Sequence, residues 1–327
     1  MIEGRHFGLP LDDVFDPPGP GTAMTRATTE ATELVVPLLR TLLEDVGLDP
    51  AAIAQVASAT YLSSMPSLES RVLFRVPFAA TTRRLPMFGQ GCMAGAAALA
   101  RTHDYLEGHP EDASVLFTVE LSSIFWYGAL QRDLSELDKQ LGDNPSAYSD
   151  MVSNILTAAL FSDGAAAAVM VGDEHPLADD GRPHPKVLAT RSVQVPDSER
   201  LMGLDYVDTG LRCVLRPEVP AMIKAALPDA VEGFLAQQGL CIDDIGLWIV
   251  HPGGPKVLDA IQSFCGLSQS DLQLSYEVLA DVGNISSATV LVMLDRVLAA
   301  PPPPAGTYGF LMAMGPGFAT ESVLLQW

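Results

Sequence analysis

The chain has 327 residues, 48% of them hydrophobic, which is enough to bury one large core or two fused halves. Its 40 acidic and 19 basic residues give a formal net charge of -21, which would repel a phosphate backbone and argues against nucleic acid as a partner. The four cysteines lack Cys-x-x-Cys spacing and no apolar run reaches about 20 residues, so we expect a cytoplasmic protein with reduced thiols, no metal and no membrane span.

In chain order, the hydrophobic patterns predict helices and strands in alternation. Residues 28–47 carry apolar residues at helical spacing, with Gly47 as a stop signal. A second helix is predicted at 219–240, and 172–185 is predicted to be a polar turn or linker. Strands are predicted at 53–64, 115–123, 164–173, 245–254, 308–317 and 319–327. This alternation indicates a layered α/β fold.

Two segments far apart in the chain resemble each other. GCMAGAAAL from Gly91 and GNISSATVL from Gly283 share a glycine, an alanine and a leucine at the same spacing. A duplicated unit explains this, with a first half at 1–172 and a second half at 186–327. In both segments a glycine turn is predicted to open a helix of small residues.

The second residue of each segment is a candidate for chemistry. Cys92 at the start of a helix would feel the positive end of the peptide dipoles, and a nearby imidazolium would lower its pKa further. His251 at a predicted strand end and Asn284 at the second glycine turn are candidate partners. Taken singly, these residues also fit a core cysteine, a structural histidine and a plain turn.

Together the motifs point to one family. GQGCMAG, LFSDGAAAAVMVGD, WIVHPGGPKVLDAI, GNISSATVLVMLD and MAMGPGFATESVLL resemble the ordered signature blocks of the chalcone synthase-like type III polyketide synthases. The match begins near Arg5 and leaves the family's first strand without a counterpart, while 127–150 is an insertion. The resemblance implies a thiolase-like fold of two similar βαβαβ halves in an αβαβα arrangement. It also implies Cys92 as the acyl-carrying nucleophile, with His251 and Asn284 as the catalytic pair.

The resemblance also implies a reaction. An acyl-CoA starter would be loaded on the cysteine, extended by decarboxylative condensation with malonyl-CoA, and cyclised to a small pyrone or phenolic product. Hydrogen-bond donors at the enolate oxygen are each worth about 3 kcal/mol in such sites. The CoA thioesters are substrates that bring their own activation, so no metal or redox cofactor is expected.

Further residues match pocket positions of the family. The matching positions are Phe161, Cys213, Phe125, Leu204, Ser122, Thr60 and Ser286. The resemblance places Phe161 beside the malonyl carboxylate. Phe125 and Leu204 are bulkier than is usual in chalcone-forming members, and Tyr61 replaces a small residue, so we expect a narrow cavity and few condensations. Cys213 stands where a gatekeeping phenylalanine is common, and Ala313 replaces a glycine in the closing loop.

The same comparison suggests contacts beyond the pocket. Met65 matches a methionine that family members insert into the neighbouring subunit, which predicts a homodimer. Lys256 and Arg5 are candidates for contact with the CoA phosphates. Leucines at helical spacing within 127–150 predict an amphipathic helix that packs on the surface, forms a lid or docks an acyl-carrier protein.

Two other functions remain open at this point. A ketoacyl synthase III-like acyltransferase uses a similar Cys, His and Asn set, although the HPGGP and GPG motifs argue against it. A non-catalytic dimer partner is the alternative from a different class. The starter unit, the number of extensions and the mode of ring closure do not follow from the sequence.

Overall fold

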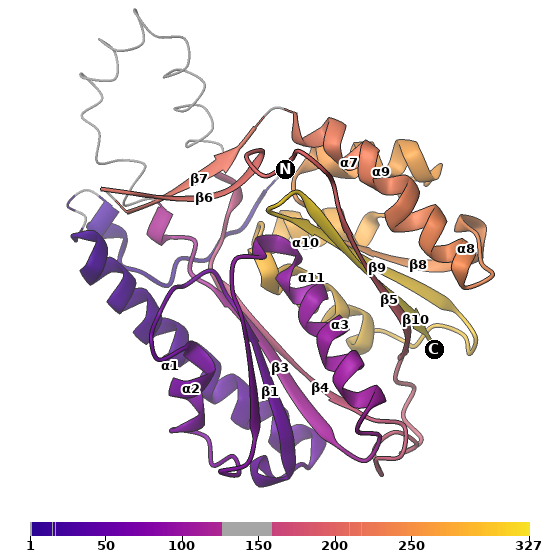
Figure 1. The fold of residues 1–327 in the computed structure, drawn as a ribbon, viewed down its shortest axis with the longest axis horizontal. Helices are drawn as coiled ribbons and strands as arrows, with labels where there is room; N and C mark the ends of the chain where they lie inside the picture. Colours follow the sequence, from indigo (N-terminus) through magenta and orange to yellow (C-terminus); the bar gives the residue numbers. More distant parts are fainter. Residues whose placement is uncertain (1, 15, 17, 126–158, 209, 217) are drawn as a thin grey trace, which may run out of the picture.

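The computed structural model describes residues 2–14, 16, 18–125, 159–208, 210–216 and 218–327. These residues form two four-stranded sheets and a two-stranded hairpin, with helices between and outside the sheets (Figure 1). The predicted insertion at 127–150 lies outside the described residues. Every helix among the described residues is too short or too polar to cross a bilayer.

The first sheet has the strand order β2-β1-β3-β4. Its strands are β1 Ile53–Ala59, β2 Arg83–Met87, β3 Ala113–Glu120 and β4 Gly164–Val171. Strand β1 pairs in parallel with β2 and β3, and β4 runs antiparallel to β3. Every residue of β3 is buried because the sheet is covered on both faces, which explains its continuous apolar pattern.

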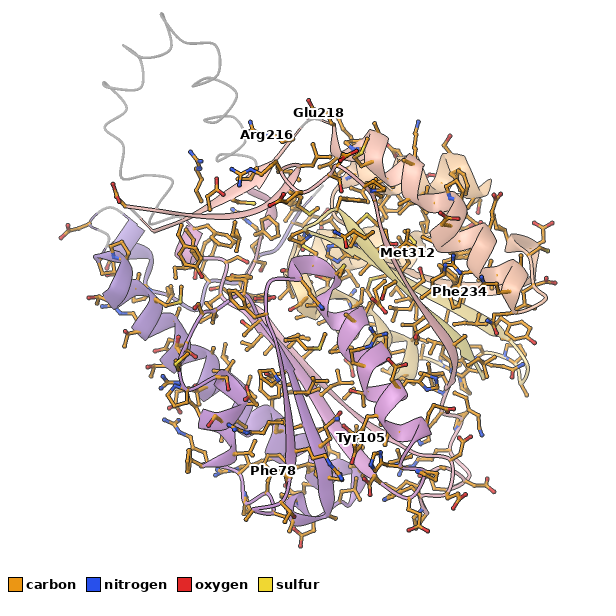
Figure 2. The ribbon with its side chains drawn as sticks, viewed as in Figure 1. Phe78, Tyr105, Arg216, Glu218, Phe234 and Met312 are labelled. Carbon is orange, nitrogen blue, oxygen red and sulfur yellow. The ribbon has the colours of Figure 1, made fainter. Side chains whose placement is uncertain are left out.

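The second sheet has the order β5-β10-β9-β8. Its strands are β5 Lys186–Gln194, β8 Ile245–Val250, β9 Tyr308–Gly315 and β10 Ala319–Gln326. Strands β8 and β9 are parallel, and β10 runs antiparallel to both of its neighbours. Side chains such as Phe234 and Met312, each 1% exposed, fill the space between this sheet and its outer helices (Figure 2).

Two helices lie between the sheets, α3 (Ala94–Glu107) and α11 (Thr289–Ala299) (Figure 1). Helix α3 contacts strands of both sheets, and its run of buried alanines allows this close approach. The other α-helices among the described residues are α1 Pro20–Val46, α2 Leu68–Leu73, α7 Val219–Leu227, α8 Gly233–Gln237, α9 Pro255–Cys265 and α10 Gln273–Val282. Helices α1 and α2 cover the outer face of the first sheet, and α7 and α9 cover that of the second. The layered arrangement confirms the predicted fold class.

Short turns of other helix types connect these elements. In the part of the chain that the structure describes, the 3-10 turns are η1 Leu11–Val14, η2 Pro50–Ala52, η3 Gly91–Met93, η5 Ile242–Asp244 and η6 Ser286–Ala288. The hairpin consists of β6 Met202–Val207 and β7 Gly210–Leu215, which the hydrophobic pattern did not predict. The division into halves at 1–172 and 186–327 stays a prediction.

Two predicted helices differ in their details. The first starts at Pro20 rather than at 28, and it ends as predicted, with Gly47 in the left-handed region at φ 73°. The predicted helix at 219–240 is interrupted by a π-helical turn, η4 Pro228–Glu232. Pro228 has no N–H to donate, and the N–H of Gly233 donates instead to the Pro228 carbonyl, one residue beyond the α-helical spacing.

Candidate active site

Cys92 lies in η3, directly before α3, where three glycines allow close backbone packing. A Cβ atom on Gly91 would lie 2.7 Å from the Pro316 ring, and one on Gly315 would lie 2.3 Å from the Gln90 carbonyl oxygen. A Cβ on Gly95 would lie 2.1 Å from the Ser287 carbonyl oxygen. The cysteine turn is therefore packed between the end of β9 and η6.

His251 follows β8 and is 1% exposed. Its backbone N–H donates to the Met312 carbonyl at 2.8 Å, which joins it to the neighbouring strand β9. Neither ring nitrogen has a hydrogen-bond partner among the described residues. Burial lowers the pKa of His251 to about 4, so the imidazole is neutral at physiological pH.

Asn284 follows Gly283, whose φ of 73° favours glycine. Its backbone bonds to the loop before β4, donating to Leu160 at 3.0 Å and accepting from Ser162 at 2.9 Å. The side-chain Oδ1 accepts from the Ser286 N–H at 2.7 Å, which orients the amide. The buried Nδ2 has no hydrogen-bond partner within the described part of the chain.

The protonation of Cys92 differs from the sequence-based expectation. Burial raises the pKa of the thiol to about 12, and the charges of Glu120 and Cys213 act in the same direction. The polar side chains of Ser286 and Asn284 lie near the sulfur, favour the thiolate and so oppose the shift. The prediction of a lowered pKa is wrong for this state because desolvation outweighs the helix dipole and the neutral His251 supplies no positive charge. Ser286, Asn284 and Cys213 all lie near the thiol.

Sequence reasoning missed Glu120, a fully buried carboxyl at the end of β3. Its Oε2 accepts from the Tyr61 N–H at 3.1 Å and from the Thr60 hydroxyl at 3.4 Å. Its Oε1 accepts from the hydroxyls of Ser287 and Ser286. Burial raises the pKa of Glu120 to about 8, against the effect of these hydrogen bonds. The sequence signal that could have identified it is an acidic residue at the end of an apolar strand.

Three aromatic rings lie in contact with one another next to Asn284. Phe161 forms an isolated parallel bridge with Asn284, and its ring meets Phe125 edge-on at 6.1 Å between centroids. The Phe125 ring lies 5.1 Å from that of Tyr61. The Tyr61 hydroxyl donates to Ser122 Oγ at 3.1 Å. We refer to Tyr61, Phe125 and Phe161 as the ring wall.

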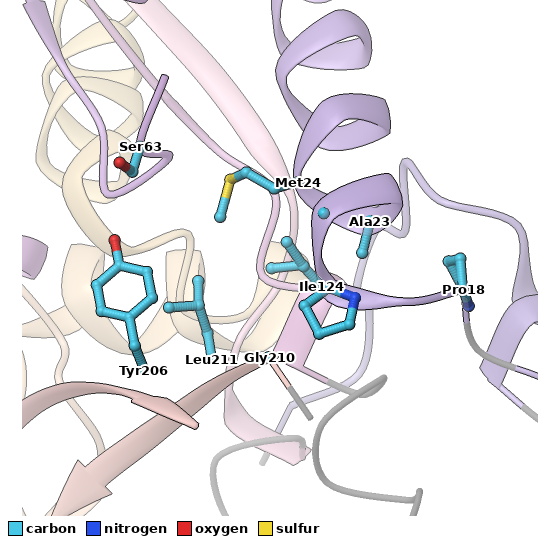
Figure 3. A pocket seen from close by; sticks show the side chains of 10 residues that line it. Pro18, Ala23, Met24, Ser63, Ile124, Tyr206, Gly210 and Leu211 are labelled. Atoms are coloured by element: carbon cyan, nitrogen blue, oxygen red, sulfur yellow. The ribbon is translucent and has the colours of Figure 1, made fainter. Parts of the chain in front are cut away.

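The hairpin brings two further predicted residues to this region. Leu204 of β6 and Cys213 of β7 face each other in the antiparallel register, and Leu204 packs against the core that contains Tyr61 and Phe125. A cavity of about 260 Å³ lies between the start of α1, the hairpin and the loops of Ser63 and Ile124 (Figure 3). Its lining residues are Pro18, Pro20, Gly21, Ala23, Met24, Ser63, Ile124, Tyr206, Gly210 and Leu211.

The other predicted residues lie farther out. Met65 is 96% exposed, in the loop between β1 and α2. Lys256 is exposed in the first turn of α9, five residues after His251. Arg5 is half-buried, and its guanidinium lies over the Phe7 ring. A Cβ atom added to Gly283 would lie 3.2 Å from the Cγ of Arg5. Arg5 is thus close to the loop of Asn284.

Comparisons with known proteins match both parts of the chain. Residues 187–327 match the family model of chalcone and stilbene synthases, C-terminal domain, and residues 12–135 match that of FAE1/type III polyketide synthase-like proteins. A 1,3,6,8-tetrahydroxynaphthalene synthase of Streptomyces peucetius is 39% identical over 100% of this chain and 81% of its own length. A 3,5-dihydroxyphenylacetyl-CoA synthase of Streptomyces toyocaensis is 30% identical over 100% of this chain and 80% of its own.

A solved structure agrees with these matches. The crystal structure of 1,3,6,8-tetrahydroxynaphthalene synthase from Streptomyces coelicolor superimposes with a TM-score of 0.86 at 27% identity, covering 99% of this chain and 85% of the other. The matches support the type III polyketide synthase interpretation rather than the ketoacyl synthase III one. With the Cys92 turn, the buried His251 and Asn284, and the two stacked sheets in place, the chain belongs to the type III polyketide synthases, enzymes of decarboxylative condensation.

Proposed function

We propose that this chain loads an acyl-CoA starter on Cys92, extends it with malonyl-CoA and cyclises the product to a small phenolic ring or pyrone. Relatives named for tetrahydroxynaphthalene and dihydroxyphenylacetyl-CoA favour the phenolic outcome. CoA thioesters supply the activation, so the proposed reaction needs no metal or redox cofactor.

One observation carries the assignment of the catalytic residues. His251 and Asn284 are each 1% exposed, yet both ring nitrogens of His251 and Nδ2 of Asn284 lack partners among the described residues. A buried polar group without a partner costs about 1–3 kcal/mol of stability. Asn284 directly precedes the segment of η6, which contacts the Cys92 turn, and His251 is bonded through its backbone to β9, which contacts the same turn. This arrangement suits donors kept for a substrate oxygen rather than for the fold.

Loading begins with attack of the Cys92 sulfur on the thioester carbonyl of the starter. The C–S bond to CoA breaks, and the proton of the thiol passes to the departing CoA sulfur by way of His251. A neutral imidazole can accept this proton, and burial keeps His251 neutral. Because the thiol is protonated at rest, proton transfer accompanies the attack rather than preceding it.

Extension uses the same two donors. Loss of carbon dioxide from malonyl-CoA leaves the bonding electron pair as an enolate, whose oxygen carries the new charge. Hydrogen bonds from Asn284 Nδ2 and from His251 would stabilise that oxygen in a site closed to water. The enolate carbon attacks the Cys92 thioester, and the sulfur leaves as thiolate. The Phe161 ring offers an apolar surface to the malonyl carboxylate and favours its loss as neutral carbon dioxide.

The outer residues fit supporting roles. Lys256, exposed in the first turn of α9, and Arg5, beside Gly283, could contact the phosphates of CoA near the site. An exposed methionine at residue 65 suits insertion into a second subunit, so we propose a homodimer, as is typical of the family. A partner that carries acyl groups on a protein stays a prediction, because the segment 127–150 lies outside the described residues.

The test is to incubate the purified protein with malonyl-CoA and a panel of acyl-CoA starters, and to record intact-protein mass and small-molecule products. Cys92→Ala should lose both the acyl adduct and the products. Cys265→Ala is the matched control, because Cys265 is also buried with a pKa raised to about 12, but it lies in α9. A folded wild-type dimer that forms neither adduct nor product would refute the proposal and favour the non-catalytic partner.

A further inference from the structure

Asp163 lies in the loop directly before β4, two residues after Phe161 of the ring wall, and is 3% exposed. Its Oδ1 accepts from the Ser123 N–H at 2.7 Å. Its Oδ2 accepts from the Gly8 N–H at 2.6 Å and from the Ser123 hydroxyl. The carboxyl of Asp163 therefore joins three segments that are distant in the chain: the N-terminal segment, the turn after β3 and the loop before β4.

The loop before β4 is also bonded to the backbone of Asn284. The Asn284 N–H donates to the Leu160 carbonyl at 3.0 Å, and the Asn284 carbonyl accepts from the Ser162 N–H at 2.9 Å. Phe161, between these two residues, forms the parallel bridge with Asn284. Both backbone hydrogen-bonding groups of Asn284 are thus satisfied by this loop. The position of the Asn284 amide therefore depends on the position of residues 160–163.

The N-terminal segment holds the same loop. The Ser162 hydroxyl accepts from the His6 N–H at 2.8 Å, and the Asp163 N–H donates to the His6 carbonyl at 2.9 Å. A Cβ atom on Gly8 would lie 3.1 Å from the Leu121 side chain and 3.4 Å from Asp163 Oδ2, so glycine allows a close approach here. The N-terminal segment, the loop before β4 and the turn of Asn284 thus form one hydrogen-bonded network, which the carboxyl of Asp163 attaches to the end of β3.

The hydrogen bonds of Asp163 compensate for its removal from water. Burial raises the pKa of Asp163, and the hydrogen bonds from Ser123 and Gly8 act in the opposite direction. One oxygen accepts the Ser123 backbone N–H and the other accepts the Gly8 backbone N–H. Asparagine has the same size, but its amide NH₂ would face one of these two N–H groups and leave it unpaired. Asp163→Asn would therefore loosen the network with little change in volume.

We propose that Asp163 is a positioning residue for the decarboxylation and extension steps, because it fixes the loop that carries Phe161 and is bonded to Asn284. This inference rests on the proposed function, in which Phe161 faces the malonyl carboxylate and Asn284 Nδ2 donates to the enolate oxygen. Both groups must hold their places as charge moves from the carboxylate to that oxygen.

Starter loading depends on different contacts. His251, which takes the thiol proton in the proposed loading step, is joined to β9 by the hydrogen bond from its N–H to the Met312 carbonyl. The Cys92 turn contacts β9 and η6. Neither of these contacts involves the loop before β4. A change at Asp163 should therefore impair decarboxylation of malonyl-CoA more than loading of the starter.

The experiment compares Asp163→Asn and Ser123→Ala with the wild type. Intact-protein mass after brief mixing with an acyl-CoA starter alone measures loading of Cys92, and labelled carbon dioxide released from carboxyl-labelled malonyl-CoA measures decarboxylation. Asp163→Asn should release carbon dioxide about tenfold to about a hundredfold more slowly, because misplaced groups at a reacting centre cost factors of this order, while its loading rate stays close to that of the wild type. Ser123→Ala keeps both backbone hydrogen bonds and should slow the release by less. Asp173→Asn makes the same change at an exposed carboxyl after β4 and should leave both rates unchanged.

The outcomes separate this inference from the proposed function. Equal losses of loading and decarboxylation in Asp163→Asn would overturn the inference, because the residue would then support the fold as a whole. Unchanged release of carbon dioxide in both variants would also overturn it and leave the proposed function intact. A wild type that forms no acyl adduct and releases no carbon dioxide would overturn both. If Asp163→Asn fails to fold, Ser123→Ala decides the test, and wild-type release in that variant would overturn the inference.

Discussion

Replacing Glu120 with glutamine should make the stability of this protein less dependent on pH near neutrality. Burial raises the pKa of Glu120 from its ordinary value of 4.5 to about 8. In the unfolded chain this carboxyl ionises near 4.5, so between these two values the folded protein holds a proton that the unfolded chain has released. The free energy of unfolding of the wild type therefore falls as pH rises through this window.

The size of the effect follows from the linkage of pKa and stability. One titrating group contributes at most about 1.4 kcal/mol per pH unit, so the wild type should lose about 2 kcal/mol between about pH 6 and about pH 7.5 from Glu120 alone. Glutamine binds no proton, and Glu120→Gln should lack this loss. Loss of the hydrogen bonds from Tyr61 and Ser287 would shift the unfolding free energy of Glu120→Gln by the same amount at every pH. The pH-dependent part of its difference from the wild type would remain.

The measurement is urea unfolding of both proteins across that range, followed by circular dichroism at one fixed protein concentration. The difference in unfolding free energy between the two should change in favour of Glu120→Gln as pH rises. A difference that stays constant would refute the reasoning, because it would mean that the buried carboxyl is already ionised in the folded protein.

Three further predictions concern other parts of the site. Gly95→Ala should destabilise the protein by about 2 kcal/mol or more, because the new Cβ would lie 2.1 Å from the Ser287 carbonyl oxygen. The melting temperature should fall, and an unchanged melting temperature would contradict this packing. His251→Gln should lose less stability than the wild type on acidification. The pKa of His251 is lowered from 6.5 to about 4, so between these values only the unfolded wild-type chain gains a proton. Urea midpoints of both proteins at pH 6.5 and about pH 5 measure this, and an equal change in the two midpoints would refute it. In the free protein, iodoacetamide should modify the exposed Cys241 before Cys92, as followed by peptide mass spectrometry; earlier labelling of Cys92 would mean that the thiol is activated at rest.

Sequence patterns predicted the parts of the fold that depend on continuous burial. Strand β3 reads as an unbroken apolar run because both of its faces are covered, and Gly47 marks the end of α1 because it adopts the left-handed conformation. The hairpin β6–β7 was missed because its residues are mostly half-buried and show no clean alternation. The π-helical turn at Pro228 was missed because the flanking residues keep an apolar periodicity across it.

For the candidate site, the sequence pointed to the turns of Cys92 and Asn284 but not to the electrostatics around them. The glycine turns around Cys92 and Asn284 are local features, so their sequence signal is strong. The pKa of the thiol depends on which distant segments exclude water from it, and that information appears when β9, η6 and the hairpin are placed together. Glu120 was overlooked for the same reason, since its four donors come from two separate parts of the chain, residues 60–61 and 286–287.

The contact between Gly95 and Ser287 has a consequence for recombination within the family. Helix α3 comes from the first half of the chain and η6 from the second, and they meet where a Cβ would approach a carbonyl oxygen to 2.1 Å. A crossover in the polar segment 172–185 leaves both sheets intact, yet the exchanged halves must still meet at this point. Chimeras of two relatives should therefore tolerate wide differences in composition, provided that glycine is retained at this position.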